Sequence, residues 1–457
     1  MMQGATIAHA LARAFAFAFV LALALAALAS DLRTSGVQAW HCRVNSSEPD
    51  WPDFCDGTST ANPHCKRYEP LWHKGSPDDW RLARALLRQS IFGGEPPRRS
   101  KPDEGPTPYT KPVVFANCMC LQRGECLAEE CARPINATYF TWVTTVPVNS
   151  TYNVTLKSHV FHSLNSSGIA ASNTEDFGEW GVPEARWPEV PIAPKKMSDT
   201  LVIFHDGHTV TNGCHYDVEN TIDWLNQLGY DVFHIQMPFH GCNAEDPLHP
   251  LPHSWFAQFA GLDGANSSKF PFMRFFLDPV WLSVNYAKDL GYKNIVMAGL
   301  SGGGWTTTVA AAIDTRIGLS LPVAGSIPCS FAHTSWDFEQ YCDQPWAGIA
   351  NYTSLYVLAT LERSRSQIQI LHEWDRCCFH TCGRHERIAE YNRFVRASGA
   401  GQFVTAATTG NVHEVNPRDR VIIASLIQRW LHRGGALEEE DIRFIPFSIT
   451  PLPGTPS

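Results

Sequence analysis

The sequence has little excess charge and no long run of basic residues. Its 457 residues include 36 lysines and arginines against 45 aspartates and glutamates, a net charge of −9. No basic patch interleaved with aromatic residues is present, which argues against nucleic acid as a partner. No segment repeats at a fixed period, which argues against solenoids and other repeat arrays. These absences leave a soluble globular domain as the expectation.

Long apolar runs are also absent, except for one near the N-terminus. Residues 14–28 are alanine, leucine, phenylalanine and valine, and they follow Arg13. This pattern predicts a secretory signal peptide over residues 1–29, cut near Ala29 or Ser30, with an uncleaved anchor as the alternative. We therefore expect a secreted protein whose mature chain has no membrane span.

Cysteine is plentiful, with 14 residues, as expected for an oxidising compartment. Seven cysteines fall in residues 30–135, a loop-rich N-terminal extension, and this odd number predicts a partner elsewhere or a free thiol. A zinc site over residues 118–131 is the alternative to disulfides there. In the rest of the chain, plausible bridges are Cys329 with Cys342, Cys214 with Cys242, and one within the group Cys377, Cys378 and Cys382.

Asn-x-Ser/Thr sequons predict N-glycans, which fits the same secretory route. They begin at Asn45, Asn136, Asn149, Asn153, Asn165, Asn266 and Asn351.

Strands alternate with helices over residues 136–433, which predicts an α/β class fold with a doubly wound, mostly parallel sheet. Two half-exposed leading strands are expected at 141–147 and 152–157. Buried strands follow at 201–204, 231–236, 295–298, 320–324, 368–371 and 402–407. Helices are expected at 216–228, 272–290, 306–313, 384–397 and 418–431.

Four segments interrupt or flank this alternation. A capped helix is expected over 76–87 in the extension, followed by a mobile Pro-rich segment at 95–110. Residues 329–365 are aromatic and irregular, as in an insertion or cap over a binding site. Residues 434–457 are expected to form a flexible C-terminal tail.

The most informative motif is Gly299-Leu300-Ser301-Gly302-Gly303, between an apolar strand and a helix. A serine hydroxyl becomes a useful nucleophile when a sharp turn exposes it beside a base and backbone N–H groups. Glycines tolerate the dihedrals of such a turn and let strand and helix pass closely. The placement predicts Ser301 as a nucleophile, against an ordinary glycine-rich turn.

An acid and a histidine follow in the order that such a nucleophile requires. Asp375 comes just after the strand at 368–371 and is the predicted acid, with Glu373 as the competitor. His413 lies between the strand at 402–407 and a helix whose start is marked by Asn416-Pro417. It is the predicted base, and His380, His385 and His432 are the alternatives.

These residues together resemble the α/β-hydrolase superfamily, over roughly residues 139–432. The resemblance implies that Ser301, His413 and Asp375 form a catalytic triad. It also implies an oxyanion hole made by the N–H of Gly302 and that of Gly207 or His208, from the segment His205-Asp206-Gly207-His208. The family usually places Gly directly after His, whereas Asp206 intervenes here.

The resemblance favours a serine hydrolase that cleaves carboxylic esters of small molecules, with no cofactor and no metal. A peptidase or thioesterase would use the same triad. A binding protein that keeps the fold without turnover is another alternative. Aromatic residues suited to line the substrate pocket are Trp305, Trp336 and Phe338.

A metal-dependent hydrolase is the remaining alternative. It rests on polar residues near the ends of two neighbouring strands, whose side chains can bind zinc. They are His205, Asp206, His208, His215, Asp217 and His240.

Overall fold

The structure is a computed structural model, and its described residues belong to one compact unit, residues 53–457. It describes residues 76–109, 137–147, 153–163, 199–208, 218–244, 253, 256, 272–328, 337–340, 349–375, 377–410 and 412–443. Within these ranges no helix is both long and apolar enough to cross a bilayer. The predicted signal peptide lies outside the described residues.

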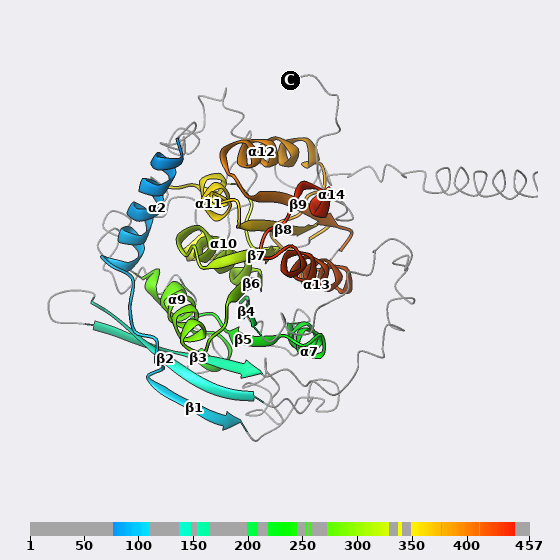
Figure 1. The fold of residues 1–457 in the computed structure, drawn as a ribbon. Helices are drawn as coiled ribbons and strands as arrows, with labels where there is room; N and C mark the ends of the chain where they lie inside the picture. The colour runs from blue at the N-terminus through cyan, green and yellow to red at the C-terminus, as the bar shows by residue number, and fades with distance from the viewer. Residues whose placement is uncertain are drawn as a thin grey trace, which may run out of the picture. The chain divides into compact units, whose positions relative to one another are not determined.

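The described strands form a single nine-stranded sheet in the order β1-β2-β3-β5-β4-β6-β7-β8-β9 (Figure 1). The pairs from β1 to β5 along this order are antiparallel, and the pairs from β5 to β9 are parallel. The strands are β1 Glu104–Tyr109, β2 Ala137–Pro147, β3 Asn153–Ser163, β4 Thr200–His205, β5 Asp231–Ile235, β6 Asn294–Leu300, β7 Ile317–Val323, β8 Ser366–His372 and β9 Gln402–Thr408. This confirms the predicted α/β class and mostly parallel sheet.

Helices cover both faces of the sheet, with α9 and α10 on one face and α7 and α13 on the other (Figure 1). The parallel strands are buried on both faces, which explains their near-continuous apolar sequences. The α-helices are α2 Pro77–Phe92, α7 Val218–Gln227, α9 Arg274–Asp289, α10 Gly302–Ile313, α11 Tyr352–Ala359, α12 His385–Ser398, α13 Pro417–His432 and α14 Glu439–Arg443. Short 3-10 turns lie at η3 Gly241–Asn243 and η6 Phe338–Gln340.

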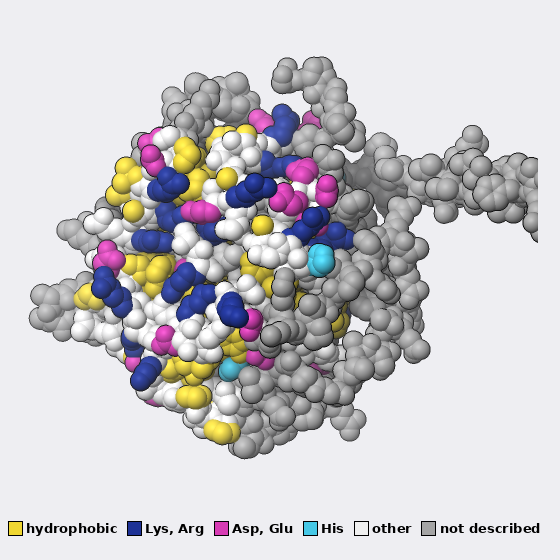
Figure 2. All heavy atoms as spheres, viewed as in Figure 1, with side chains coloured by type: hydrophobic (Ala, Val, Ile, Leu, Met, Phe, Trp, Pro, Cys, Tyr) yellow, Lys and Arg dark blue, Asp and Glu magenta, His cyan; other side chains and the backbone are white. Residues whose placement is uncertain are grey.

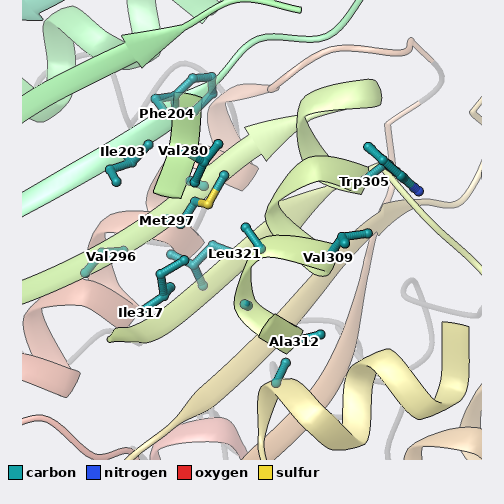
Figure 3. Close-up of a cluster of buried hydrophobic side chains, with 14 of the residues drawn as sticks. Ile203, Phe204, Val280, Val296, Met297, Trp305, Val309, Ala312, Ile317 and Leu321 are labelled. Carbon is teal, nitrogen blue, oxygen red and sulfur yellow. The ribbon is translucent and has the colours of Figure 1, made fainter. Parts of the chain in front are cut away.

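The core lies on both faces of the central strands. Figure 3 shows Met297 of β6 beside Val280 of α9, with Val309 on α10. Phe204 of β4 and Leu321 of β7 lie on the other face of the sheet from Met297. All five are at most 1% exposed. This packing holds the C-terminal ends of β4, β6 and β7 in fixed register.

Helix α2, in the N-terminal extension, is anchored to the end of α10. Ser76 and Asp79 form the capping box that begins the helix, so the predicted helix is confirmed. Arg84 Nε donates to Ala312 O at 2.9 Å, and Arg88 Nε donates to Ile313 O at 2.6 Å. Because α10 begins at Ser301, these arginines satisfy carbonyl groups at the far end of the same helix.

Three segments differ from the expectations. Residues 104–109, expected to be mobile, form the edge strand β1, where their prolines are tolerated because an outer edge needs no further donors. Helix α11 occupies part of 329–365 and is buried, so this part is core and not a cap. Helix α14 lies in the expected flexible tail, where Leu437 and Ile442 are buried. These two side chains belong to the hydrophobic core, so this part of the tail is packed against the rest of the protein.

On the face drawn in Figure 2, lysine and arginine side chains are interspersed with apolar, neutral and acidic ones. The structure therefore shows no broad area of one charge on this face.

Candidate active site

Ser301 occupies a sharp turn between β6 and α10. Its φ of 56° and ψ of −123° place a non-glycine residue in a disfavoured region of backbone space. Two backbone hydrogen bonds hold Ser301 in this strained conformation. Ser301 N donates to Val323 O at 2.9 Å, and Trp305 N donates to Ser301 O at 2.9 Å. A strained, over-determined serine at a strand-to-helix turn is the geometry of a nucleophile elbow.

The flanking glycines are required by close backbone contacts. A Cβ on Gly299 would lie 2.6 Å from Gly303 O and 2.7 Å from His205 O. A Cβ on Gly303 would collide with the His205 carbonyl group. The glycines therefore let β6, α10 and the end of β4 approach closely, as the motif predicts.

Asp375 and His413 are joined by a hydrogen bond of 2.8 Å, from His413 Nδ1 to Asp375 Oδ2. The other carboxylate oxygen, Oδ1, accepts from the backbone N–H groups of Cys377 at 2.8 Å and Cys378 at 3.3 Å. Burial alone would raise the pKa of Asp375, but the hydrogen bond and charge of His413 outweigh it and the pKa is lowered. The carboxylate is thus oriented and kept ionised.

The loop that carries Asp375 contains a disulfide between the adjacent residues Cys377 and Cys378. Cys242 and Cys382 each take part in a disulfide bond as well. The suggested partner of Cys242, Cys214, lies outside the described residues, as do Cys329 and Cys342.

Glu373, the competing acid, is directed elsewhere. Its Oε1 lies 3.5 Å from His385 Nε2, on a partly exposed part of the surface. Its backbone N–H donates to Thr408 O at 2.7 Å. The structure therefore places Asp375, and not Glu373, against His413.

Ser301, Asp375 and His413 lie at one edge of the sheet. They follow β6, β8 and β9, which run parallel, so their C-terminal ends share that edge. Ser301 is 8% exposed and His413 is 7% exposed, so both are largely buried at this edge. Open α/β sheets carry their functional groups at this edge.

The predicted oxyanion-hole residues also meet at the elbow. Gly302 is the first residue of α10, where backbone N–H groups have no partner within the helix. A Cβ on Gly207 would lie 2.8 Å from Ser301 Cβ, so the loop after β4 passes directly beside the serine. The Gly207 N–H donates to Asp206 Oδ1 at 2.8 Å, which leaves His208 as the better candidate for the second donor.

Of the three predicted pocket residues, the structure describes the side chain of Trp305 only. Trp305 is fully buried and packs edge-on against Phe276 in the core (Figure 3). Its burial shows that it packs in the core, and its role in lining a substrate pocket stays a prediction. Trp336 lies outside the described residues, and the side chain of Phe338 does also.

A second histidine–carboxylate pair, which the sequence analysis missed, lies close to the first. His372 Nε2 is 2.8 Å from Asp419 Oδ2, and both side chains are fully buried. Asp419 also accepts from Thr408 Oγ1 at 3.0 Å and closes the capping box of α13 with Asn416. Burial would lower the pKa of His372, but Asp419 outweighs it and raises the pKa.

A cluster of histidines and acids lies near the turn at Ser301, where the ring of His208 is close to Gly302. We call it the His–Glu cluster, and it consists of His208, His240, His253, Asp337 and Glu339. Of the six residues considered as metal ligands from the sequence, only His208 and His240 belong to it. His205 and Asp206 make other contacts, and His215 and Asp217 lie outside the described residues. His253 and Glu339 belong to no recognisable sequence motif.

No family model matches this chain. Among solved structures, it is similar to the acetyl xylan esterase from Paenibacillus sp. R4, at 12% identity and a TM-score of 0.43, over 79% of this chain and 96% of that one. It is also similar to Est1E from Butyrivibrio proteoclasticus, at 12% identity and a TM-score of 0.34, over 66% and 99%. Methylesterase BT1017 matches at 12% identity and a TM-score of 0.42, over 86% and 70%. The α/β-hydrolase fold of this chain rests on its own strand order and on the turn at Ser301.

Proposed function

We propose that the protein is a secreted serine hydrolase that cleaves carboxylic esters. The observation that carries the proposal is the 2.8 Å hydrogen bond between His413 and Asp375 at the sheet edge that also bears Ser301. A serine hydroxyl, an imidazole and an oriented carboxylate are the three groups that acyl transfer through serine needs.

In the proposed mechanism, His413 Nε2 removes the proton of Ser301 as Oγ attacks the ester carbonyl. Asp375 holds His413 in the tautomer with the proton on Nδ1 and stabilises the imidazolium that forms. The lowered pKa of Asp375 supports this role, because the carboxylate must stay ionised while His413 carries the positive charge.

The tetrahedral intermediate collapses when His413 gives its proton to the leaving alcohol and the C–O bond to that alcohol breaks. The acyl group is then bonded to Ser301 Oγ, and a water activated by His413 releases it as a carboxylic acid. The N–H groups of Gly302 and His208 are the proposed donors to the oxyanion, assisted by the N-terminus of α10.

Secretion, N-glycans and a disulfide-rich extension remain part of the proposal, from the sequence alone. Asn351, one of the sequons, is the N-cap of α11, where its side-chain oxygen accepts from Ser354 N at 2.9 Å. A glycan would be attached to the nitrogen of this side chain, which the cap does not use.

The test is hydrolysis of a panel of esters that vary in acid and alcohol size, with matched thioesters and amides. Ser301→Ala is expected to lower kcat by about three to six powers of ten without loss of folding. Near-normal rates in this variant would refute the proposal. A preference for amides or thioesters would keep the triad but replace the ester assignment, and no turnover at all would favour a binding protein.

A further inference from the structure

The His–Glu cluster brings metal-binding side chains from several loops to one point. His208 follows β4, His240 follows β5, His253 precedes α9, and Asp337 and Glu339 come from η6 and the residue before it. Ligand atoms of His208, His240 and His253 all lie within 4.8 Å of one another, as do those of His208, Asp337 and Glu339.

The centre of the cluster is formed by two imidazoles and one carboxylate. His253 Nδ1 lies 2.6 Å from Glu339 Oε2, and His208 Nε2 lies 3.1 Å from Glu339 Oε1. The two ring nitrogens are themselves 3.1 Å apart. Four ligand atoms therefore point toward one another over very short distances.

The remaining nitrogen of His253 shows which form this ring takes. His253 Nε2 lies 2.9 Å from Pro238 O, and a carbonyl oxygen only accepts, so Nε2 carries a proton. In the neutral ring Nδ1 then offers a lone pair to a cation, whereas in the protonated ring Nδ1 donates to Glu339 Oε2 at 2.6 Å. A histidine that ligates metal almost always donates its other ring N–H in this way.

The carboxylate of Glu339 calls for a compensating positive charge. Glu339 is 0% exposed and His253 is 4% exposed, and a buried carboxylate must be paired or must coordinate a metal. Its two oxygens face His253 Nδ1 at 2.6 Å and His208 Nε2 at 3.1 Å, so a cation bound between these atoms would supply that charge.

We propose that His208, His253 and Glu339 bind a divalent cation of the zinc class, with His240 and Asp337 near enough to complete its coordination. Two imidazoles and a carboxylate form a donor set that zinc accepts in tetrahedral sites, and among the described residues no cysteine belongs to the cluster. Ligands about 2.0 Å from a tetrahedral zinc lie about 3.3 Å apart. The two contacts of 3.1 Å would open by about 0.2 Å, and the contact of 2.6 Å by about 0.7 Å.

A cation bound in the His–Glu cluster would influence the turn at Ser301 through His208. A Cβ built on Gly302 would lie 2.7 Å from His208 Cε1 and 2.9 Å from His208 Nδ1. One edge of this ring therefore faces the N-terminus of α10 while Nε2 faces the cluster. A bound cation would fix the loop after β4 and with it the proposed oxyanion donor at His208. This positioning role rests on the proposed function, whereas the binding of the cation does not.

The primary test is direct metal binding by the full-length protein. After removal of metals with a chelator, the protein is titrated with Zn²⁺ against a competing chromophoric chelator and with Co²⁺, whose visible absorption reports a tetrahedral site. We expect one equivalent of tight binding. We expect at least about a tenfold loss of affinity in Glu339→Gln, which keeps the size of the side chain but removes the charge. Glu373→Gln is the matched control, because Glu373 faces a single histidine, and it should bind like the wild type.

No saturable Zn²⁺ binding by the folded wild type would overturn the proposal in favour of protons shared within the cluster. Equal affinity in the wild type and Glu339→Gln would also overturn it, by placing the cation elsewhere. If Glu339→Gln does not fold, His208→Gln replaces it, since His208 is the most exposed of the three ligands. Covalent labelling of Ser301 by a fluorophosphonate separates the two proposals: labelling without Zn²⁺ binding defeats this one, and Zn²⁺ binding without labelling defeats the serine hydrolase.

Discussion

Two histidine–carboxylate pairs lie at the ends of β8 and β9, and they differ in what their histidines can reach. Both have the same 2.8 Å separation between ring nitrogen and carboxylate oxygen. The side chains of His372 and Asp419 are fully buried, whereas His413 is 7% exposed. Asp419 is further engaged by Thr408 and by the cap of α13, whereas Asp375 is held by backbone N–H groups of its own loop.

The difference shows that a short histidine–carboxylate hydrogen bond does not by itself identify a catalytic pair. The His372–Asp419 pair joins β8 to the start of α13, which is a structural task. The His413–Asp375 pair places an imidazole at the edge of the sheet that carries Ser301. Substitutions in the two pairs should therefore have opposite consequences for activity and stability.

The largest expected effect is on turnover when His413 is changed. His413→Gln should lower kcat by about three to six powers of ten, because His413 is the proposed acceptor of the serine proton. His372→Gln is the matched variant, and its kcat per folded molecule should stay within about tenfold of the wild type. Steady-state ester hydrolysis, corrected for folded protein by circular dichroism, measures both. Equal losses in the two variants would remove the distinction between the pairs.

Asp375→Asn should lower kcat by about four powers of ten, because an amide favours the wrong tautomer of the imidazole. Glu373→Gln, two residues away, should change kcat by less than about threefold. The ratio of the two rate constants is the measurement. A larger loss in Glu373→Gln would transfer the role of the acid to Glu373.

The free energy of unfolding should fall more when His372 is changed than when His413 is changed. His372→Ala should lower the free energy of unfolding by about 3 kcal/mol, because it leaves the Asp419 carboxylate buried without its cationic partner. His413→Ala should cost less, about 1–2 kcal/mol, because His413 is slightly exposed and the Asp375 carboxylate keeps the backbone N–H groups of Cys377 and Cys378. Urea unfolding followed by tryptophan fluorescence measures both. A greater loss for His413→Ala would show that the second pair is not the structural one.

The smallest expected effect is the pH dependence of the buried pair. Since the pKa of His372 is raised in the folded protein, its contribution to stability is complete below the unfolded value of about 6.5. The contribution is lost as the pH rises through the folded pKa. The difference in unfolding free energy between wild type and His372→Gln should therefore shrink as the pH rises above about 6.5. A difference that grows with pH would contradict the sign of this coupling.

The sequence predicts the parts of the site that depend on local geometry. The elbow could be recognised because Gly299 and Gly303 are demanded by backbone contacts that only glycine permits. Asp375 and His413 could be placed because each follows a strand of the parallel sheet. The choice of Asp375 over Glu373 needed the structure, since alternation along an extended segment allows both.

The parts that the sequence did not predict depend on long-range packing. His253 and Glu339 lie 86 positions apart, and neither belongs to a motif. The edge strand β1 was not predicted, because its prolines favour a loop in a sequence-based reading. The docking of α14 depends on two apolar residues, Leu437 and Ile442, in an acidic segment. The packing of Trp305 against Phe276 could not be predicted, because an aromatic residue beside an elbow suits both a pocket and a core.

The most direct test of the account is the site of covalent reaction with a fluorophosphonate in the folded protein, located by peptide mass spectrometry. The account predicts one adduct, on Ser301, formed rapidly in the wild type and in His372→Gln but very slowly in His413→Gln. An adduct at another serine, or equal rates in the wild type and His413→Gln, would contradict it.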